Sequence, residues 1–128
     1  MFNANKYFQF EIDIKKFFEK QKFEVVHWSA NRRNDGGKDV IATTKKGDEI
    51  VAKLIQCKCY APKHKIGPNL VRELAGSMLE YGDKCDGIII TTSDFTEDAE
   101  KLRIKYKNEN NYNIEFINGK QLLDLINI

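Results

Sequence analysis

Apolar residues recur at helical spacing in two segments of the chain. The first set predicts an amphipathic helix over residues 4–20: Tyr7, Phe10, Ile14, Phe17 and Phe18. The second set predicts a helix that begins at Pro68 and ends at Gly82: Val71, Leu74, Ala75, Met78 and Leu79. Proline is favoured at the first position of a helix, and glycine is favoured just after its end.

Shorter apolar runs predict β-strands. One strand covers residues 23–28, and a hairpin pairs 39–44 with 50–59 across the polar turn 45–48. Residues 87–92 are apolar without alternation, which is typical of a strand that is covered on both faces.

The last third of the chain predicts three more elements. Thr96 is suited to cap a helix, because its hydroxyl can accept a backbone hydrogen bond and the acids that follow favour the helix dipole. A strand over residues 113–117, a turn at Asn118-Gly119 and a helix over 121–126 complete the sequence.

The predicted order of elements is α-β-β-β-α-β-α-β-α. This order indicates an α/β fold with a mixed central β-sheet flanked by helices on both sides. The chain of 128 residues is long enough for one hydrophobic core, and it contains no internal repeat, linker or low-complexity segment. We therefore expect a single domain over residues 1–128.

Composition excludes some classes of protein. Hydrophobic residues make up 41% of the chain and charged residues 31%, as in ordinary soluble proteins. No stretch approaches the roughly 20 apolar residues that a membrane span needs, and the N-terminus lacks the apolar segment of a signal peptide. We expect a cytoplasmic protein without a membrane partner.

The distribution of charge is more informative than the net charge of +2. Five cations and no acidic residue lie between Ile50 and Arg72: Lys53, Lys58, Lys63, Lys65 and Arg72. Such a local cationic surface attracts phosphates. A solvated, lysine-rich loop is the alternative interpretation of Lys63 and Lys65 taken alone.

Polar residues lie at the start of one predicted strand and near the end of the next one. Asp39 follows the glycine pair Gly36-Gly37, and Gln56 and Lys58 lie near the end of the next strand. Alternate strand residues point to one face, so Gln56 and Lys58 project together, and the hairpin brings Asp39 close to them. Mg²⁺ prefers oxygen ligands, and a lysine can orient water and stabilise developing charge. The pattern is suited to holding Mg²⁺ against a phosphate.

Glu11 is a further candidate, because it falls at the edge of the apolar face of the first helix. A carboxylate there needs a cation or a metal as its partner. Simpler readings exist for each residue: Asp39 and Lys58 could merely end strands, and Gln56 could be a hydrogen-bonded core amide. Glu11 could pair with a lysine. The four residues taken together favour a catalytic site over four unrelated structural roles.

The cysteines give little support to a zinc site. Three of them, an odd number, agree with a reducing compartment: Cys57, Cys59 and Cys85. Cys57-Lys58-Cys59 could be half of a zinc site, but its spacing is C-x-C, and His27, His64 and Cys85 do not complete a convincing set. Buried thiols are the better interpretation.

The sequence resembles the catalytic domain of Mrr-type restriction endonucleases, within the PD-(D/E)xK nuclease superfamily. The resemblance rests on Asp35-Gly36-Gly37-Lys38-Asp39 followed by Gln56-Cys57-Lys58. Further segments match in family order and cover nearly the whole chain: Phe10-Glu11, Val71-Arg72-Glu73-Leu74-Ala75-Gly76, Thr91-Thr92-Ser93-Asp94-Phe95-Thr96 with Ala99, and Ile117-Asn118-Gly119 with Leu122. Lys38 departs from the pattern, because a small apolar residue is usual there.

The resemblance implies a restriction-endonuclease-like core and a Mg²⁺-dependent DNA endonuclease, with Mn²⁺ as a substitute. It implies four metal-binding groups, with Gln56 in the place of the superfamily's acid: Asp39, Gln56, the backbone carbonyl of Cys57, and Glu11 as accessory carboxylate. Lys58 would be the catalytic lysine. We expect DNA contacts from five cations: Arg32, Arg33, Lys63, Lys65 and Arg72. One active site cuts one strand, so a double-strand break would need a homodimer or a partner subunit.

Two other functions stay open. A structure-specific nuclease that resembles Holliday-junction resolvases would share the fold. A nucleic-acid-binding module with little or no cleavage is the second, because Gln56 is neutral, although glutamine is usual there in Mrr-type sequences. The family's separate DNA-recognition domain has no counterpart in the sequence, so target preference is expected to be weak or to come from a partner. A role in restriction, in defence or in DNA processing fits each nuclease reading.

Overall fold

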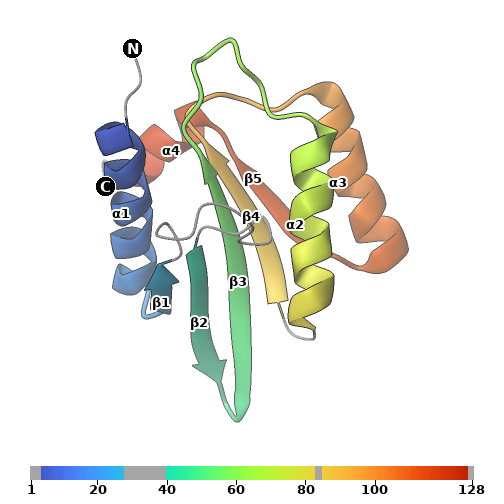
Figure 1. Cartoon of the computed structure of the whole chain (residues 1–128). Coiled ribbons are helices and arrows are strands. Elements are labelled where there is room, and N and C mark those ends of the chain that lie inside the picture. Colours follow the sequence, from blue (N-terminus) through green and yellow to red (C-terminus); the bar gives the residue numbers. More distant parts are fainter. Residues whose placement is uncertain (1–3, 28–39, 83–84, 127–128) are drawn as a thin grey trace.

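The computed structural model describes residues 4–27, 40–82 and 85–126. Within these ranges a five-stranded sheet lies between two pairs of helices (Figure 1). The elements follow the predicted order: α1 (Ala4–Lys20), β1 (Glu24–His27), β2 (Val40–Lys46), β3 (Glu49–Lys58), α2 (Pro68–Tyr81), β4 (Cys85–Thr91), α3 (Glu97–Asn110), β5 (Ile114–Ile117) and α4 (Gly119–Ile126). The predicted α/β fold with a mixed sheet is confirmed.

The strands are ordered β1-β2-β3-β4-β5 across the sheet. β2 is antiparallel to its neighbours β1 and β3, whereas β3, β4 and β5 run parallel. The carboxyl ends of β3, β4 and β5 therefore meet on one side of the sheet, at the top of Figure 1. We call this side the carboxyl edge and define it by the last strand residues Lys58, Thr91 and Ile117.

Each face of the sheet has its own hydrophobic core. On the α1/α4 face, buried residues of α1 and α4 pack against strand residues such as Ile55 and Cys57. On the α2/α3 face, α2 and α3 pack against strand residues such as Leu54 and Ile89. Because neighbouring residues of a strand point to opposite faces, consecutive positions in β3 serve the two cores in turn.

The predicted limits of α2 and the predicted start of α3 are confirmed. Pro68 is the first residue of α2, and Gly82 ends it with φ 97°, a backbone conformation that favours glycine. The Thr96 hydroxyl accepts a hydrogen bond from the backbone N–H of Ala99 at 3.1 Å and so caps α3.

Several predicted strand and helix boundaries differ from the observed ones by one or two residues, and two of these differences have a local reason. The β2–β3 hairpin turns at Gly47-Asp48 instead of over residues 45–48, because Gly47 adopts φ 65° and lets the strands extend to the turn. The last helix begins at Gly119, since Asn118 caps it. The Asn118 side chain accepts from the N–H of Gln121, and the Gln121 side chain accepts from the N–H of Asn118, each at 2.9 Å. This reciprocal pair is a capping box.

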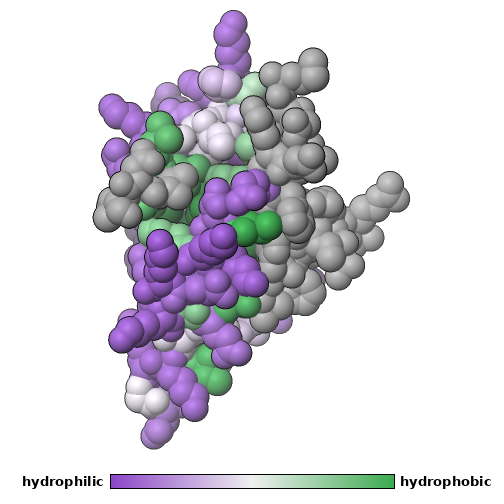
Figure 2. All heavy atoms as spheres, turned by 90° about the vertical axis from the view of Figure 1, so that its left-hand side faces the viewer, coloured by the Kyte–Doolittle hydropathy of each residue, from purple (hydrophilic) through white to green (hydrophobic). Residues whose placement is uncertain are grey.

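The surface is mostly hydrophilic where the β2–β3 hairpin projects from the body of the molecule. Figure 2 shows this in its lower half, with a smaller hydrophobic area above it. None of the described helices is both long enough and apolar enough to cross a membrane.

Candidate active site

The end of β3 carries the polar residues that the sequence singled out. β3 is flanked by β2 and β4, and it places Gln56 beside Ile89 and Lys58 beside Thr91. Gln56 follows the alternation of Ala52 and Leu54, as predicted, and these two residues belong to the core on the α2/α3 face.

The Gln56 amide is buried without a complete set of partners. Its side chain is 3% exposed, and its Oε1 is the buried side-chain polar atom without a hydrogen bond among the residues that the structure describes. A buried acceptor left in this way costs about 1–3 kcal/mol of folding free energy. The interpretation of Gln56 as a hydrogen-bonded core amide is therefore wrong for Oε1. An oxygen of this kind suits a cation, because a metal can supply the missing interaction.

Lys58 and Cys57 differ in how their side chains are placed. The Lys58 side chain is half-buried and forms no ion pair or hydrogen bond within the described ranges. The Cys57 side chain is fully buried on the α1/α4 face. Only the main chain of Cys57 is therefore available to a site that includes Gln56 and Lys58.

Four of the predicted site residues are not placed by the structure. Asp39, Arg32 and Arg33 lie outside the described residues, and the side chain of Glu11 is also outside them. The backbone next to two of these positions is described. Val40 is buried and pairs with Ile55, the residue before Gln56. Helix α1, which contains position 11, packs on the α1/α4 face.

Metal-binding clusters of the usual kind are missing from the described part of the chain. No three His, Cys, Asp or Glu side chains come together there in a way that could hold an ion. Cys57 and Cys59 thus complete no zinc site with those residues, and none of the three cysteines forms a disulfide bond. Asp39 and the Glu11 side chain lie outside this described part of the chain. Among the described residues, the buried Gln56 Oε1 is a side-chain oxygen without a hydrogen-bond partner.

The segment after Lys58 carries exposed cations at the carboxyl edge. Lys63, His64 and Lys65 are exposed, and neither lysine forms an ion pair within the described residues. The His64 ring stacks on the ring of Tyr60, with 4.1 Å between centroids and an interplanar angle of 4°. Arg72 is exposed on α2 and donates to Asn69 Oδ1 at 2.9 Å. The loop leads from β3 directly into α2 in Figure 1.

Thr92 and Ser93 contribute to this region, although the sequence predicted no role for them beyond the family resemblance. The Thr92 hydroxyl donates to the carbonyl of Tyr60 at 2.7 Å, and the Ser93 hydroxyl donates to the carbonyl of Pro62 at 3.2 Å. The available signal was a pair of hydroxyl residues directly after an apolar strand. Their partners are about thirty positions away in the sequence, so no local pattern could identify them.

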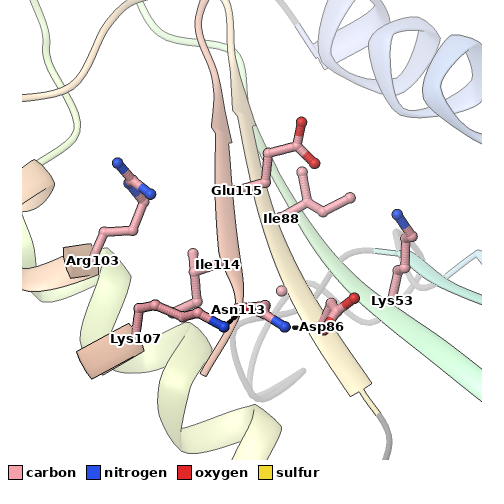
Figure 3. Close-up of a pocket in the computed structure, with 9 residues that line it drawn as sticks. Lys53, Asp86, Ile88, Arg103, Lys107, Asn113, Ile114 and Glu115 are labelled. Carbon is pink, nitrogen blue, oxygen red and sulfur yellow. Dashed lines mark hydrogen bonds between the residues drawn. The ribbon is translucent and has the colours of Figure 1, made fainter. Parts of the chain in front are cut away.

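A pocket lies near the amino-terminal ends of β4 and β5, and Figure 3 shows its side chains. Its volume is about 240 Å³. Its polar groups bind one another: Asn113 accepts a hydrogen bond from Lys107 at 2.5 Å and donates to Asp86 at 3.3 Å. Beside it, burial and the charge of Asp86 raise the pKa of the Cys85 thiol. This pocket is distant along β4 from the carboxyl edge, and its mutually satisfied groups make it a weaker candidate site.

A mixed sheet between two helical layers, with polar residues at the end of its central strand, defines the restriction-endonuclease-like fold. The chain belongs to the restriction endonuclease family of the Mrr catalytic-domain type, because the family model described as restriction endonuclease matches residues 2–126. Its domain is therefore of the nuclease class.

Solved structures share this fold at low sequence identity. The restriction endonuclease MspJI, in complex with a 27-mer oligonucleotide, matches with a TM-score of 0.68 and 22% identity over 91% of this chain and 26% of that chain. The DNA modification-dependent restriction endonuclease AspBHI matches with a TM-score of 0.68 and 17% identity over 96% of this chain and 31% of that chain. A repair endonuclease from Pyrococcus abyssi matches with a TM-score of 0.51 and 20% identity over 92% of this chain and 47% of that chain.

This chain thus spans less than half the length of these three structures. No curated protein matches it.

Proposed function

We propose that the protein is a Mg²⁺-dependent DNA endonuclease that hydrolyses phosphodiester bonds, with Mn²⁺ as a substitute metal. The observation that carries the proposal is the buried Gln56 Oε1, which lacks a hydrogen bond and lies two residues before the half-buried Lys58. Family membership supports the same reaction class. Restriction, defence or DNA processing in the cytoplasm is the biological setting that we propose.

The metal would be held by oxygen atoms from three elements. Gln56 Oε1 fits this role because it is a buried acceptor without a partner. Asp39 is bonded to Val40, and Val40 pairs with Ile55. Ile55 directly precedes Gln56 in β3. The Cys57 backbone carbonyl and the Glu11 carboxylate are the other proposed ligands.

A bound divalent ion would polarise the scissile phosphate and a water molecule. The chain's own contribution is to position the reactants and to stabilise charge. We assign to the Lys58 ammonium the orientation of the attacking water and the stabilisation of negative charge on the phosphate in the transition state. Partial burial helps this role, because a half-buried cation is screened less by salt than a fully exposed one.

DNA is the proposed substrate, and the loop after β3 is its proposed contact surface. Lys63 and Lys65 have no acidic partners within the described ranges, so they are available to phosphate groups. Arg72 follows them on α2, and Arg32 and Arg33 are proposed contacts from the segment before β2. MspJI was solved with an oligonucleotide, which supports this substrate class. Cleavage of both strands would require a homodimer or a partner subunit.

A plasmid-nicking assay tests the proposal. We expect wild-type protein to nick supercoiled DNA with Mg²⁺ or Mn²⁺ and not with EDTA. Lys58→Ala should lower the rate at least about a hundredfold, since the residue acts on charge that develops in the transition state. Lys105→Ala, which removes an exposed cation on α3, is the matched control and should nick like wild type.

Cleavage of other DNA substrates and a measurement of DNA binding separate the remaining alternatives. Faster cutting of a four-way junction than of a linear duplex of equal length would favour a resolvase-like nuclease. DNA binding without any metal-stimulated cleavage would replace the endonuclease by a binding module. Full activity of Lys58→Ala would remove the proposed catalytic lysine.

A further inference from the structure

The chain after β3 is bonded to the chain after β4 beyond the end of the sheet. Thr92 donates its N–H to the carbonyl of Lys58 at 3.3 Å and its hydroxyl to the carbonyl of Tyr60 at 2.7 Å. Both acceptors are main-chain carbonyls at or just beyond the end of the regular hydrogen-bond ladder between β3 and β4. One residue thus holds the chain on both sides of Cys59.

The next two residues extend this series of bonds. The Ser93 hydroxyl donates to the carbonyl of Pro62 at 3.2 Å, and the carbonyl of Asp94 accepts from the N–H of Ile66 at 2.9 Å. Hydroxyl groups therefore take the place of backbone N–H groups where the parallel pairing of β3 and β4 stops. The path of the exposed cationic loop is fixed along its length, although its Lys63 and Lys65 side chains face solvent.

The turn that supplies these bonds is itself anchored. The N–H of Ser93 donates to the Thr91 hydroxyl at 3.1 Å, and both residues are buried. The carbonyl of Ser93 accepts from the N–H of Gly119 at 2.9 Å. A donor held in this way loses little conformational freedom when it bonds to the loop, so its bond constrains the loop effectively.

We propose that Thr92 and Ser93 are positioning residues, which act through the main chain of the segment after β3. Thr92 fixes the end of the strand that carries Lys58, and Ser93 fixes the loop that carries Lys63 and Lys65. The proposal rests on the nuclease function proposed above. The two hydroxyls are expected to have different effects. Thr92 lies beside the proposed catalytic lysine, and Ser93 lies beside the proposed DNA contacts.

Isosteric removal of each hydroxyl tests this division. Thr92→Val should lower kcat about tenfold with little change in Kd for DNA, since a small displacement of a reacting group affects the chemical step. Ser93→Ala should raise Kd for DNA several-fold and leave kcat nearly unchanged. Thr92→Ser retains the hydroxyl and should restore most of the rate.

Thr96→Val is the matched control, because it removes the hydroxyl that caps α3 and bonds to Ala99 within the same turn region. It should lower the melting temperature at least as much as Thr92→Val without the loss of kcat. If the two variants lose activity in proportion to stability, Thr92 has only a structural role and the proposal fails. A Thr92→Ser variant as slow as Thr92→Val would also overturn it.

Amide hydrogen exchange tests the proposal independently of cleavage. Thr92→Val and Ser93→Ala should speed exchange at residues that follow Lys58, through Ile66, while Thr96→Val should speed it mainly in α3. Unchanged exchange in the loop would refute the proposal even if wild-type protein cuts DNA. Faster exchange in a protein that does not cut DNA would instead reject the proposed nuclease function and leave the positioning of the loop established.

Discussion

At the scale of single residues, Gln56 combines a stability cost with a proposed role. A buried amide oxygen without a partner is unfavourable by about 1–3 kcal/mol, so an apolar residue of similar shape should be tolerated better. Unpartnered buried polar groups are rare in native proteins, and a catalytic role or a bound ion is among the reasons for which they are retained. Stability and activity are therefore expected to change in opposite directions at this position.

We predict that Gln56→Met raises the free energy of unfolding by about 1 kcal/mol and abolishes metal-stimulated cleavage. The thioether has a similar length and does not require a hydrogen bond. Denaturant unfolding and plasmid nicking measure the two effects. Gln9→Met is the control, because Gln9 is exposed and bonds only to Asp13 at 2.9 Å among the described residues. Loss of stability in Gln56→Met would show that the amide is satisfied in solution.

A charged replacement provides a second test of Gln56 as a ligand. Gln56→Glu should raise the affinity of the free protein for Mg²⁺ or Mn²⁺, because a carboxylate is a stronger ligand than an amide. It should retain at least some cleavage. Calorimetric titration of the wild type, Gln56→Glu and Asp39→Asn, with and without DNA, checks this expectation. Absence of metal binding in all three, even with DNA, would contradict the endonuclease proposal.

At the scale of elements, the start of α4 is joined closely to the turn after β4. A Cβ atom at Gly119 would lie 2.3 Å from the carbonyl oxygen of Thr92 and 2.9 Å from its carbon. Both are backbone atoms, which cannot move away as a flexible side chain can. The glycine in the Ile117-Asn118-Gly119 match to the family thus has a steric reason.

We predict that Gly119→Ala lowers the free energy of unfolding by about 1–3 kcal/mol, because overpacking forces the two backbones apart. It should also speed amide exchange in the turn that contains Thr92. Gly76→Ala is the control. Gly76 lies within α2, and its Cβ would meet nothing within 4 Å, so alanine should stabilise the helix by about 0.5–1 kcal/mol. Equal stability of Gly119→Ala and wild type would mean that the contact relaxes freely.

Sequence patterns predicted the elements well where one local signal decides. Apolar spacing and the flanking residues Pro68, Gly82 and Thr96 set the limits of α2 and the start of α3. The start of α4 was missed because Asn118 was interpreted as a turn, whereas its side chain and that of Gln121 form a cap. Strand alternation correctly placed Gln56 on the face of Leu54.

The rest of the site depends on tertiary contacts. The missing partner of Gln56 Oε1 becomes visible only when the surrounding helices and strands are packed. The hydroxyl bonds of Thr92 and Ser93 join segments that are 32 and 31 residues from their partners. Local periodicity carries no information about such pairs, so the sequence could not assign these two residues a role.

At the scale of the whole molecule, positive charge without nearby acidic residues in the sequence follows the end of β3. Neutralising Lys63, Lys65 and Arg72 together should weaken DNA binding for all sequences alike. The slope of log K against log salt should become shallower by about 0.9 for each lost phosphate contact. Binding measured at several salt concentrations checks the expectation, with Lys101→Ala and Lys105→Ala as controls on α3. An unchanged slope, or a loss that is confined to one DNA sequence, would exclude backbone contacts by these residues.

The mixed pairing of β3 also has a consequence for the order in which activity appears during folding. β3 pairs with β2 through a short hairpin, whereas helix α2 lies between β3 and β4 in the sequence. Contacts between distant segments form late, because closing a long loop has an entropic cost. The hairpin alone lacks the Thr92 and Ser93 bonds that fix the chain around Lys58. An incompletely folded chain would therefore not cleave DNA. When the protein refolds after dilution from denaturant, cleavage activity should return no earlier than the pairing of β3 with β4.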